Sequence, residues 1–270
     1  MRYTPEISTH ILGHASRILA HDEPDQLKLE RLWHTLTALR AGVLAGVLRN
    51  TVGSRVLSGP FKGMQLTQAA MIDIYAPILT GHYEHELHAV FEKVITKPYK
   101  RILNIGCGFG YYSVGLALRM PQAIVDAFDT APGEQKRCAE MAIVNGVQDR
   151  VKIGAAFNGE NFTSYADGAT LAIVDIEGAE MELLDPARYP ALAKIDTVVE
   201  AHDVYREGLS KTLAERFAPT HEIEIIYNRP DIFDFAPLLG REYFINPLDS
   251  AIVHWENRAG ATPWVIMWAK

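Results

Sequence analysis

The stretch RILNIGCGFGYYSVGLALR, at residues 101–119, constrains the fold of this chain more than any other segment. The apolar run Arg101–Ile105 leads directly into glycines at positions 106, 108 and 110, and the helix-forming run Tyr111–Arg119 follows. Glycine is needed where the backbone turns sharply and where a ligand must approach without meeting a Cβ atom. The free N–H groups at the start of the helix face that ligand. The pattern predicts a strand, a ligand-binding turn and a helix.

The remainder of the chain alternates between strand-like and helix-like segments. Further predicted strands are Ala123–Phe128, Val151–Ile153, Leu171–Val174, Thr197–Val199, Ile223–Tyr227 and Trp264–Trp268. Predicted helices are Glu134–Asn145, Ala179–Leu184, Leu209–Phe217 and a segment that begins at Glu84, buries Leu87, Val90, Phe91 and Val94, and ends before Pro98. Such alternation predicts an α/β fold, a parallel sheet with helices on both faces.

The first 60 residues differ from the rest and are expected to form a helical N-terminal extension to a main domain at 61–270. Residues 1–23 are mixed in character and we expect little order there, and we expect a short strand-and-turn segment at 61–80. From Pro24 onwards, apolar residues recur near a helical spacing. They are Leu29, Leu32, Trp33, Leu36, Leu39, Val43 and Val47. This stripe is expected to pack on the main domain or to join two subunits in a homodimer.

Composition excludes several classes of protein. Lysine and arginine total 26 against 33 acidic residues, a net charge of −7, which argues against a dedicated nucleic-acid binder. The cysteines, Cys107 and Cys138, are too few for a disulfide framework. The most membrane-like run, Ala41–Leu48, is far shorter than the roughly 20 residues that a span needs. The N-terminus lacks the apolar core of a signal peptide. We therefore expect a cytoplasmic protein without a membrane partner.

The spacing of the glycines distinguishes between cofactors. A dinucleotide-binding turn has the pattern G-x-G-x-x-G, but Tyr111 stands where its third glycine would be. The G-x-G-x-G turn found here resembles motif I of class I S-adenosylmethionine-dependent methyltransferases. Asp129 ends the second predicted strand, where an acidic side chain can accept hydrogen bonds from both ribose hydroxyls. Asp126, earlier on the same strand, is expected to be an exposed strand carboxylate.

The phrase LAIVDIEGAEMELL places Asp175, Glu177 and Glu180 at the end of the fourth predicted strand. Carboxylates grouped at a strand end need a cationic or polar partner, although capping of the next helix is the simpler explanation for Glu180 and an equally good one for Glu177. Together with motif I and the phrase AFDTAP, the IEGAE phrase resembles the FkbM-type methyltransferases over about residues 80–205. The resemblance implies a Rossmann-like seven-stranded sheet, mostly parallel with an antiparallel last strand. It also implies methyl transfer from S-adenosylmethionine, with S-adenosylhomocysteine as product, commonly to oxygen.

The expected cofactor-binding residues are Glu84, Asn104, Gly106, Cys107, Gly108, Gly110, Tyr111, Asp129, Asp175 and Glu177. One of them departs from the family pattern. Motif I usually has an acidic residue two positions before the first glycine, and here that residue is Asn104. An amide cannot form an ion pair with the ammonium group of the cofactor, so cofactor binding is weaker or Glu84 provides the missing charge.

A hydroxyl acceptor needs a group that takes up its proton, and a histidine or a carboxylate suits this role. His202 follows the fifth predicted strand at the sheet edge that also holds Asp175, and it is our first choice for the general base. Asp175 is the second, either as the base or as a polar group near the sulfonium. Asp175, Glu177, Glu200 and His202 could also converge on a metal ion, but no spacing among them is diagnostic, so we expect no bound metal.

The segment 228–262 separates the last two strands and is expected to be an insertion that covers the substrate. It contains Arg229, Phe233, Phe235, Arg241 and Tyr243, which suit a polar or aromatic small molecule or simply pack the insertion onto the sheet. The sequence thus predicts a methyltransferase that acts on a hydroxyl group of a small molecule. The alternatives are methylation of nitrogen in a small molecule or amino acid, and a non-catalytic protein that binds an adenosine ligand. Methylation of protein or RNA is disfavoured by the charge.

Overall fold

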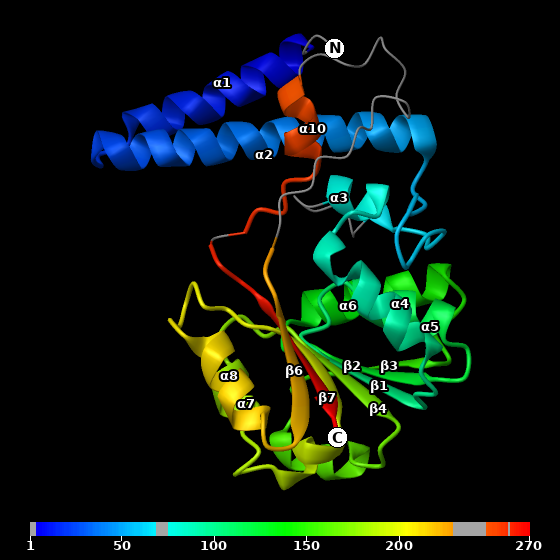
Figure 1. The fold of residues 1–270 in the computed structure, drawn as a ribbon. Helices are drawn as coiled ribbons and strands as arrows, with labels where there is room; N and C mark the ends of the chain where they lie inside the picture. Colours follow the sequence, from blue (N-terminus) through cyan, green and yellow to red (C-terminus); the bar gives the residue numbers. More distant parts are fainter. Residues whose placement is uncertain (1–3, 69–74, 229–246, 259) are drawn as a thin grey trace. The chain divides into compact units, whose positions relative to one another are not determined.

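The computed structural model describes residues 4–68, 75–228, 247–258 and 260–270, which form two compact units. The helical unit contains α1 (Pro5–Ala20), α2 (Asp25–Val52), α3 (Tyr75–Thr80) and α10 (Pro247–Val253). The other unit, the sheet unit, contains every strand of the described chain (Figure 1). The residues Arg229, Phe233, Phe235, Arg241 and Tyr243 of the expected insertion lie outside the described residues.

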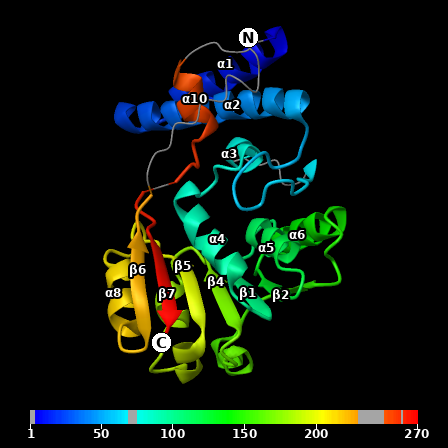
Figure 2. The same cartoon turned by 45° about the vertical axis from the view of Figure 1, so that its right-hand side comes forward.

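The sheet unit is built on seven strands. They are β1 (Arg101–Ile105), β2 (Ile124–Phe128), β3 (Val151–Gly154), β4 (Thr170–Val174), β5 (Asp196–Glu200), β6 (His221–Ile226) and β7 (Trp264–Ala269). Their order is β3-β2-β1-β4-β5-β7-β6, and β7 runs antiparallel to both of its neighbours while the other pairs are parallel (Figure 2). This is the Rossmann-like methyltransferase sheet, so the predicted fold class is confirmed.

Helices cover both faces of this sheet. They are α4 (His88–Thr96), α5 (Tyr111–Arg119), α6 (Pro132–Val144), α7 (Glu180–Leu183) and α8 (Leu209–Phe217), with short 3-10 helices η2 (His85–Leu87), η3 (Gly159–Tyr165) and η4 (Pro190–Lys194). Side chains alternate between the two faces of a strand. On β1, Leu103 and Ile105 join a core cluster with Leu213 of α8, whereas Asn104 bonds to Ser113 of α5. The sheet is therefore enclosed between two helical layers.

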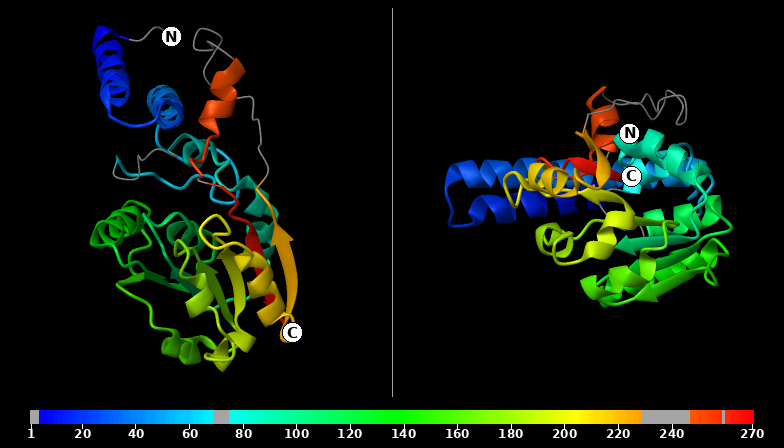
Figure 3. Two further views of the ribbon diagram at one scale, coloured as in Figure 1. Left: turned by 90° about the vertical axis from the view of Figure 1, so that its left-hand side faces the viewer. Right: turned by 60° about the horizontal axis from the view of Figure 1, so that its bottom comes forward.

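The helical unit differs in detail from the sequence expectation. Helix α1 lies alongside α2 (Figure 3), so the expectation of little order in residues 1–23 was wrong for residues 5–20. The start of α1 is fixed by Thr4, whose Oγ1 accepts a hydrogen bond from Ile7 N at 3.3 Å, and by Pro5 in the first turn. Residues 75–80 form α3 rather than the expected strand. No described helix combines the length and apolar character that crossing a bilayer requires.

The helix predicted from Pro24 is confirmed as α2, but its buried face is not the predicted stripe. The buried residues of α2 are Ala41, Leu44, Ala45 and Leu48, in its second half. In the first half Leu29, Trp33 and Leu36 are exposed, and Trp33 is 74% accessible. Part of the apolar stripe thus has no cover from residues 4–68, 75–228, 247–258 and 260–270.

Candidate active site

The turn after β1 brings the ends of β1 and β4 together. Gly106 has φ +80°, and a Cβ atom there would lie 1.6 Å from the carbonyl oxygen of Asp175. Asp175 N in turn donates a hydrogen bond of 2.9 Å to the carbonyl oxygen of Ile105. Both the positive φ and the close approach require glycine at position 106. The sequence folds locally so that the first glycine of motif I sits against the first acidic residue of the D-x-E-G-x-E phrase.

A cavity of about 700 Å³ opens at the carboxyl ends of β1, β2, β3 and β4. Gly106, Asp129, Asp175 and Glu177 line it, as does Phe157 from the segment after β3. Ligands of open α/β sheets bind at this edge, and a cavity of this volume is typical of a small-molecule or cofactor site. Four of the predicted cofactor-binding residues therefore face one cavity.

Asp129 is fixed in position by the backbone around it. Its Oδ2 accepts a hydrogen bond from Gly108 N at 2.9 Å and its Oδ1 accepts one from Ala131 N at 2.8 Å. A carboxylate has about four lone-pair sites, so both oxygens retain capacity for further donors. Asp126 is not the exposed carboxylate expected from the sequence: it is buried and forms an ion pair with Arg101 at 2.5 Å.

The remaining predicted cofactor residues do not line this cavity. They are Glu84, Asn104, Cys107, Gly108, Gly110 and Tyr111. Asn104 points to the α5 face, where its Nδ2 donates to Ser113 Oγ at 2.8 Å. Glu84 is buried beside Arg258, with 3.4 Å between Oε1 and Nη2. Tyr111 packs edge-on against Phe61. Any role of these residues in cofactor binding stays a prediction.

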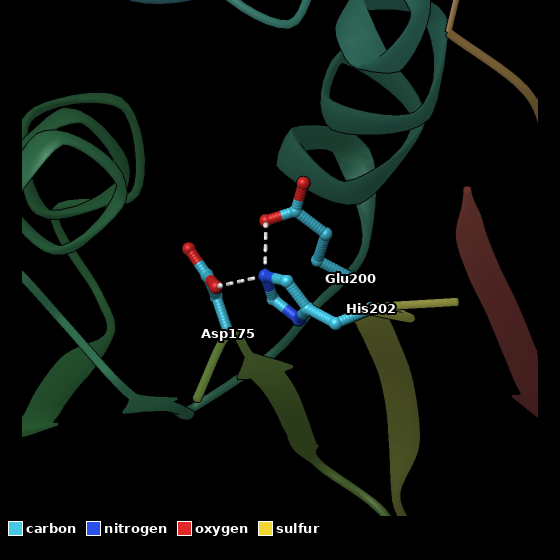
Figure 4. A group of neighbouring side chains, drawn as sticks. All are labelled: Asp175, Glu200 and His202. Carbon is cyan, nitrogen blue, oxygen red and sulfur yellow. Dashed lines mark ion pairs between the residues drawn. The ribbon is translucent and has the colours of Figure 1, made fainter. Parts of the chain in front are cut away.

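His202 lies among carboxylates at the end of β5. Its Nδ1 donates to Glu180 Oε1 at 2.8 Å. Its Nε2 lies 3.7 Å from both Asp175 Oδ1 and Glu200 Oε2 (Figure 4). A third oxygen, Glu177 Oε2, lies 3.3 Å from the same nitrogen. We call Asp175, Glu177, Glu180, Glu200 and His202 the acidic cluster. Because Asp175 and Glu177 also line the cavity, the cluster borders the space where a ligand would lie.

Two side chains outside the cavity hold this cluster in place. Glu180 is fully buried, and its Oε1 also accepts hydrogen bonds from Gly178 N at 3.1 Å and Ile176 N at 3.3 Å. Arg258 Nη1 donates to Glu200 Oε1 and to Thr262 Oγ1. From the sequence, Glu180 was expected to be a capping residue and Arg258 was not a candidate site residue. Glu200 was a candidate metal ligand from the sequence, and it lies two residues before His202 in an extended segment, so the two share one face.

The surroundings of His202 determine its protonation. Burial lowers the pKa of His202, but the hydrogen bond to Glu180 and the charges of Glu200 and Asp175 outweigh burial and raise the pKa to about 9. Burial and the neighbouring Glu200 raise the pKa of Asp175 well above its usual value. His202 therefore carries a proton at neutral pH in this arrangement and cannot accept another. Of the two predicted bases, Asp175 is the one that both lines the cavity and has a raised pKa.

Several solved structures resemble this chain distantly. No protein-family model and no curated protein matches the sequence. Among solved structures, the O-methyltransferase TomG from Streptomyces achromogenes in complex with S-adenosylmethionine is 14% identical, with a TM-score of 0.46 over 71% of this chain and 81% of TomG. Cofactor-bound Rv0187 from MTB is 13% identical, with a TM-score of 0.44 over 76% and 99%. Human methyltransferase 10 domain containing protein is 12% identical, with a TM-score of 0.41 over 68% and 80%. Likenesses this distant say nothing about substrate or mechanism.

Proposed function

We propose that this protein is a cytoplasmic S-adenosylmethionine-dependent methyltransferase of the FkbM-like type. Its acceptor in this proposal is a hydroxyl group of a small molecule. One observation supports this above all: the glycine turn at Gly106 and the carboxylate of Asp129 line the same cavity of about 700 Å³ at the ligand-binding edge of a methyltransferase sheet. The DIEGAE phrase at 175–180, which carries the family resemblance, borders that cavity through Asp175 and Glu177.

The residues around the cavity fit this cofactor. Asp129 has acceptor capacity left for the two ribose hydroxyls after its bonds to Gly108 N and Ala131 N. Gly106 allows close approach because it has no Cβ atom, and Phe157 offers an apolar wall for a base. S-adenosylmethionine supplies an electrophilic methyl group on a sulfonium when it is bound. The chain itself positions two ligands and excludes water from the space between them.

In this proposal the acceptor binds and loses its proton at the end of the cavity where Asp175 lies beside His202. A hydroxyl must lose its proton to become a good nucleophile, and Asp175 is placed to receive that proton because it lines the cavity. His202 Nε2 lies 3.7 Å from Asp175 Oδ1 and stabilises the ionised carboxylate. We expect Asp175→Asn and His202→Ala each to lower kcat by about 100-fold or more while the affinity for S-adenosylmethionine stays close to wild type. An unchanged kcat in both variants would remove this assignment.

Calorimetric titration of the purified protein with S-adenosylmethionine and S-adenosylhomocysteine tests the cofactor. We expect one molecule of each to bind per chain. Asp129→Ala removes two charge-assisted hydrogen bonds to the ribose and is expected to weaken binding by about 10–100-fold. Asp149→Ala, which removes an exposed carboxylate that does not line the cavity, serves as the matched control. Failure of both ligands to bind at sub-millimolar concentration would contradict the proposal.

A panel of hydroxyl and amine acceptors then separates the remaining alternatives. Methyl transfer to hydroxyls supports the proposal, whereas transfer to amines alone would identify a nitrogen methyltransferase. Stoichiometric cofactor binding without turnover on any acceptor would favour a non-catalytic adenosine-ligand protein. We further propose that the chain forms a homodimer through α1 and α2, since the first half of α2 exposes Leu29, Trp33 and Leu36.

A further inference from the structure

We propose that Asp175, Glu200 and His202 form a binding site for one divalent metal ion of the Mn²⁺ type at the acceptor end of the cavity. One ligand atom from each of the three residues lies within 4.8 Å of the other two (Figure 4). No metal was expected from the sequence, because the spacing of these residues along the chain is not diagnostic. Their convergence in space at the ends of β4 and β5 provides the missing information.

His202 provides the observation that separates this site from an ordinary group of acidic residues. Its side chain is only 4% exposed, and its Nδ1 is committed to Glu180 at 2.8 Å. That bond aims Nε2 at Asp175, Glu177 and Glu200, yet no oxygen lies closer to it than 3.3 Å. A ring N–H normally donates at about 2.7–3.2 Å. A buried imidazole with one nitrogen bonded to a carboxylate and the other without a hydrogen bond is arranged as metal-binding histidines are. An ion that binds Nε2 displaces the proton of that nitrogen to water.

The two carboxylates also point an uncommitted oxygen at the same place. Asp175 Oδ1 is buried and has no hydrogen-bond partner. Arg258 binds Glu200 through Oε1, so Glu200 Oε2 is the oxygen that faces His202. Removing a carboxylate from water costs several kcal/mol, and two such groups side by side repel each other. A divalent ion between the two carboxylates would remove that repulsion.

The spacing and chemistry of the three donors suit a first-row divalent ion. Bonds of about 2.0–2.2 Å from a metal place its ligand atoms about 3–4 Å apart. The distances of 3.7 Å from His202 Nε2 to Asp175 Oδ1 and to Glu200 Oε2 fall in this range. Carboxylate oxygens favour ions such as Mn²⁺ and imidazole nitrogen favours Zn²⁺ and Fe²⁺, whereas a set containing imidazole does not suit Ca²⁺.

Three protein ligands leave coordination positions open, and Asp175 joins the site to the cavity. An ion bound there would hold an acceptor oxygen and lower the pKa of its hydroxyl, so that the proton leaves to water at a lower pH. This part of the inference rests on the proposed function. In that case Asp175 and His202 act on the acceptor through the ion, and Glu180 and Arg258 are positioning residues for the ligands.

Titration of the chelator-treated full-length protein with Mn²⁺, followed by electron paramagnetic resonance, tests the site. We expect one Mn²⁺ bound per chain, with spin-echo modulation from an imidazole nitrogen. Glu200→Gln and Asp175→Asn should each weaken Mn²⁺ binding at least tenfold, and His202→Ala should abolish the nitrogen modulation. His202→Gln is the replacement if the alanine variant does not fold. Glu215→Gln, which removes an exposed carboxylate on α8, should bind Mn²⁺ as the wild type does.

The absence of Mn²⁺ binding in the wild type, or a nitrogen signal that persists without His202, would overturn the metal site. Calorimetry with S-adenosylmethionine on the same metal-free protein separates this failure from failure of the proposed function. Cofactor binding without Mn²⁺ binding would leave the methyltransferase assignment and remove the metal site. Mn²⁺ binding without cofactor binding would leave the metal site and remove the methyltransferase.

Discussion

The buried side chain of Glu180 determines the orientation and the charge of His202, which was the first choice for the general base from the sequence. Burial raises the pKa of Glu180, but the hydrogen bonds from His202 and from its own backbone and that of Gly178 outweigh burial and keep the carboxyl ionised. An ionised Glu180 fixes both the orientation and the charge of His202. An acidic residue in the first turn of a helix is normally a cap, so no pattern in the sequence indicated this contact. It depends on the packing of the segment after β5 against α7, which is not a local property.

A second buried histidine, His221 at the start of β6, offers a pH test of stability. Its Nε2–H donates to the carbonyl oxygen of Ile195 at 3.1 Å, and burial lowers its pKa below the ordinary value. The folded protein thus keeps His221 neutral, while the unfolded chain takes up a proton as pH falls below about 6.5. The stabilisation from His221 is complete above that pH and is lost as pH falls towards the folded pKa.

His221→Gln removes this titration and keeps polar atoms at the site. We therefore expect the wild type to lose more stability than His221→Gln between pH 7.5 and pH 5.0. The melting temperatures of both proteins, measured by circular dichroism across this range, provide the check. Parallel curves for the two proteins would show that His221 does not titrate differently on folding.

The glycine turn is the structural element on which the site depends, and Gly106→Ala tests it. A Cβ atom there would overlap the carbonyl of Asp175 and would also require a positive φ. We expect loss of cofactor binding together with a loss of stability well above the roughly 1–2 kcal/mol that a left-handed alanine costs alone. Gly168→Ala is the matched control, since Gly168 has φ +73° but no atom within 4 Å of the added Cβ.

Urea unfolding of the two variants separates the steric clash from the backbone strain. Equal losses of stability in Gly106→Ala and Gly168→Ala would mean that the turn is not tightly packed against β4. Wild-type affinity for S-adenosylhomocysteine in Gly106→Ala would mean that this turn does not shape the cofactor site.

Elements with strong local signals were predicted well. The bounds of β1, α5 and α8 coincide with the predicted ranges, because each couples a buried apolar pattern to glycine or proline at its ends. Elements without such signals were missed, among them η3, η4 and α10. Helix α1 was missed although Thr4 and Pro5 form a recognisable helix start and Ile7, Ile11 and Ile18 recur near a helical spacing.

At the scale of the molecule, the strand order could not be read from local patterns. Periodicity predicts that strands and helices alternate, but only the family resemblance implied the antiparallel last strand, which the pairing of β7 with β5 and β6 confirms. The acidic cluster illustrates the same limit for the site. The sequence predicted that Asp175, Glu200 and His202 could converge at one sheet edge. The contacts that orient them, from Glu180 to His202 and from Arg258 to Glu200, depend on three-dimensional packing.

The exposed half of α2 leads to a prediction about assembly. Leu29, Trp33 and Leu36 lie three and four residues apart and so share one face of the helix. A two-fold pairing of two copies would bury this face against itself. We expect light scattering to give twice the chain mass of 30.0 kDa, and Trp33→Ser to shift the protein towards the monomer. A wild-type monomer at micromolar concentration would contradict the homodimer.

The central claim is that the cavity between Gly106 and Asp129 binds a sulfonium nucleoside. A crystal structure of the protein grown with S-adenosylhomocysteine tests it most directly. We expect the ribose hydroxyls within hydrogen-bond distance of the Asp129 carboxylate and the amino-acid portion beside Gly106. Density for the ligand at another place, or a cavity closed by its own side chains in the presence of saturating ligand, would contradict the account.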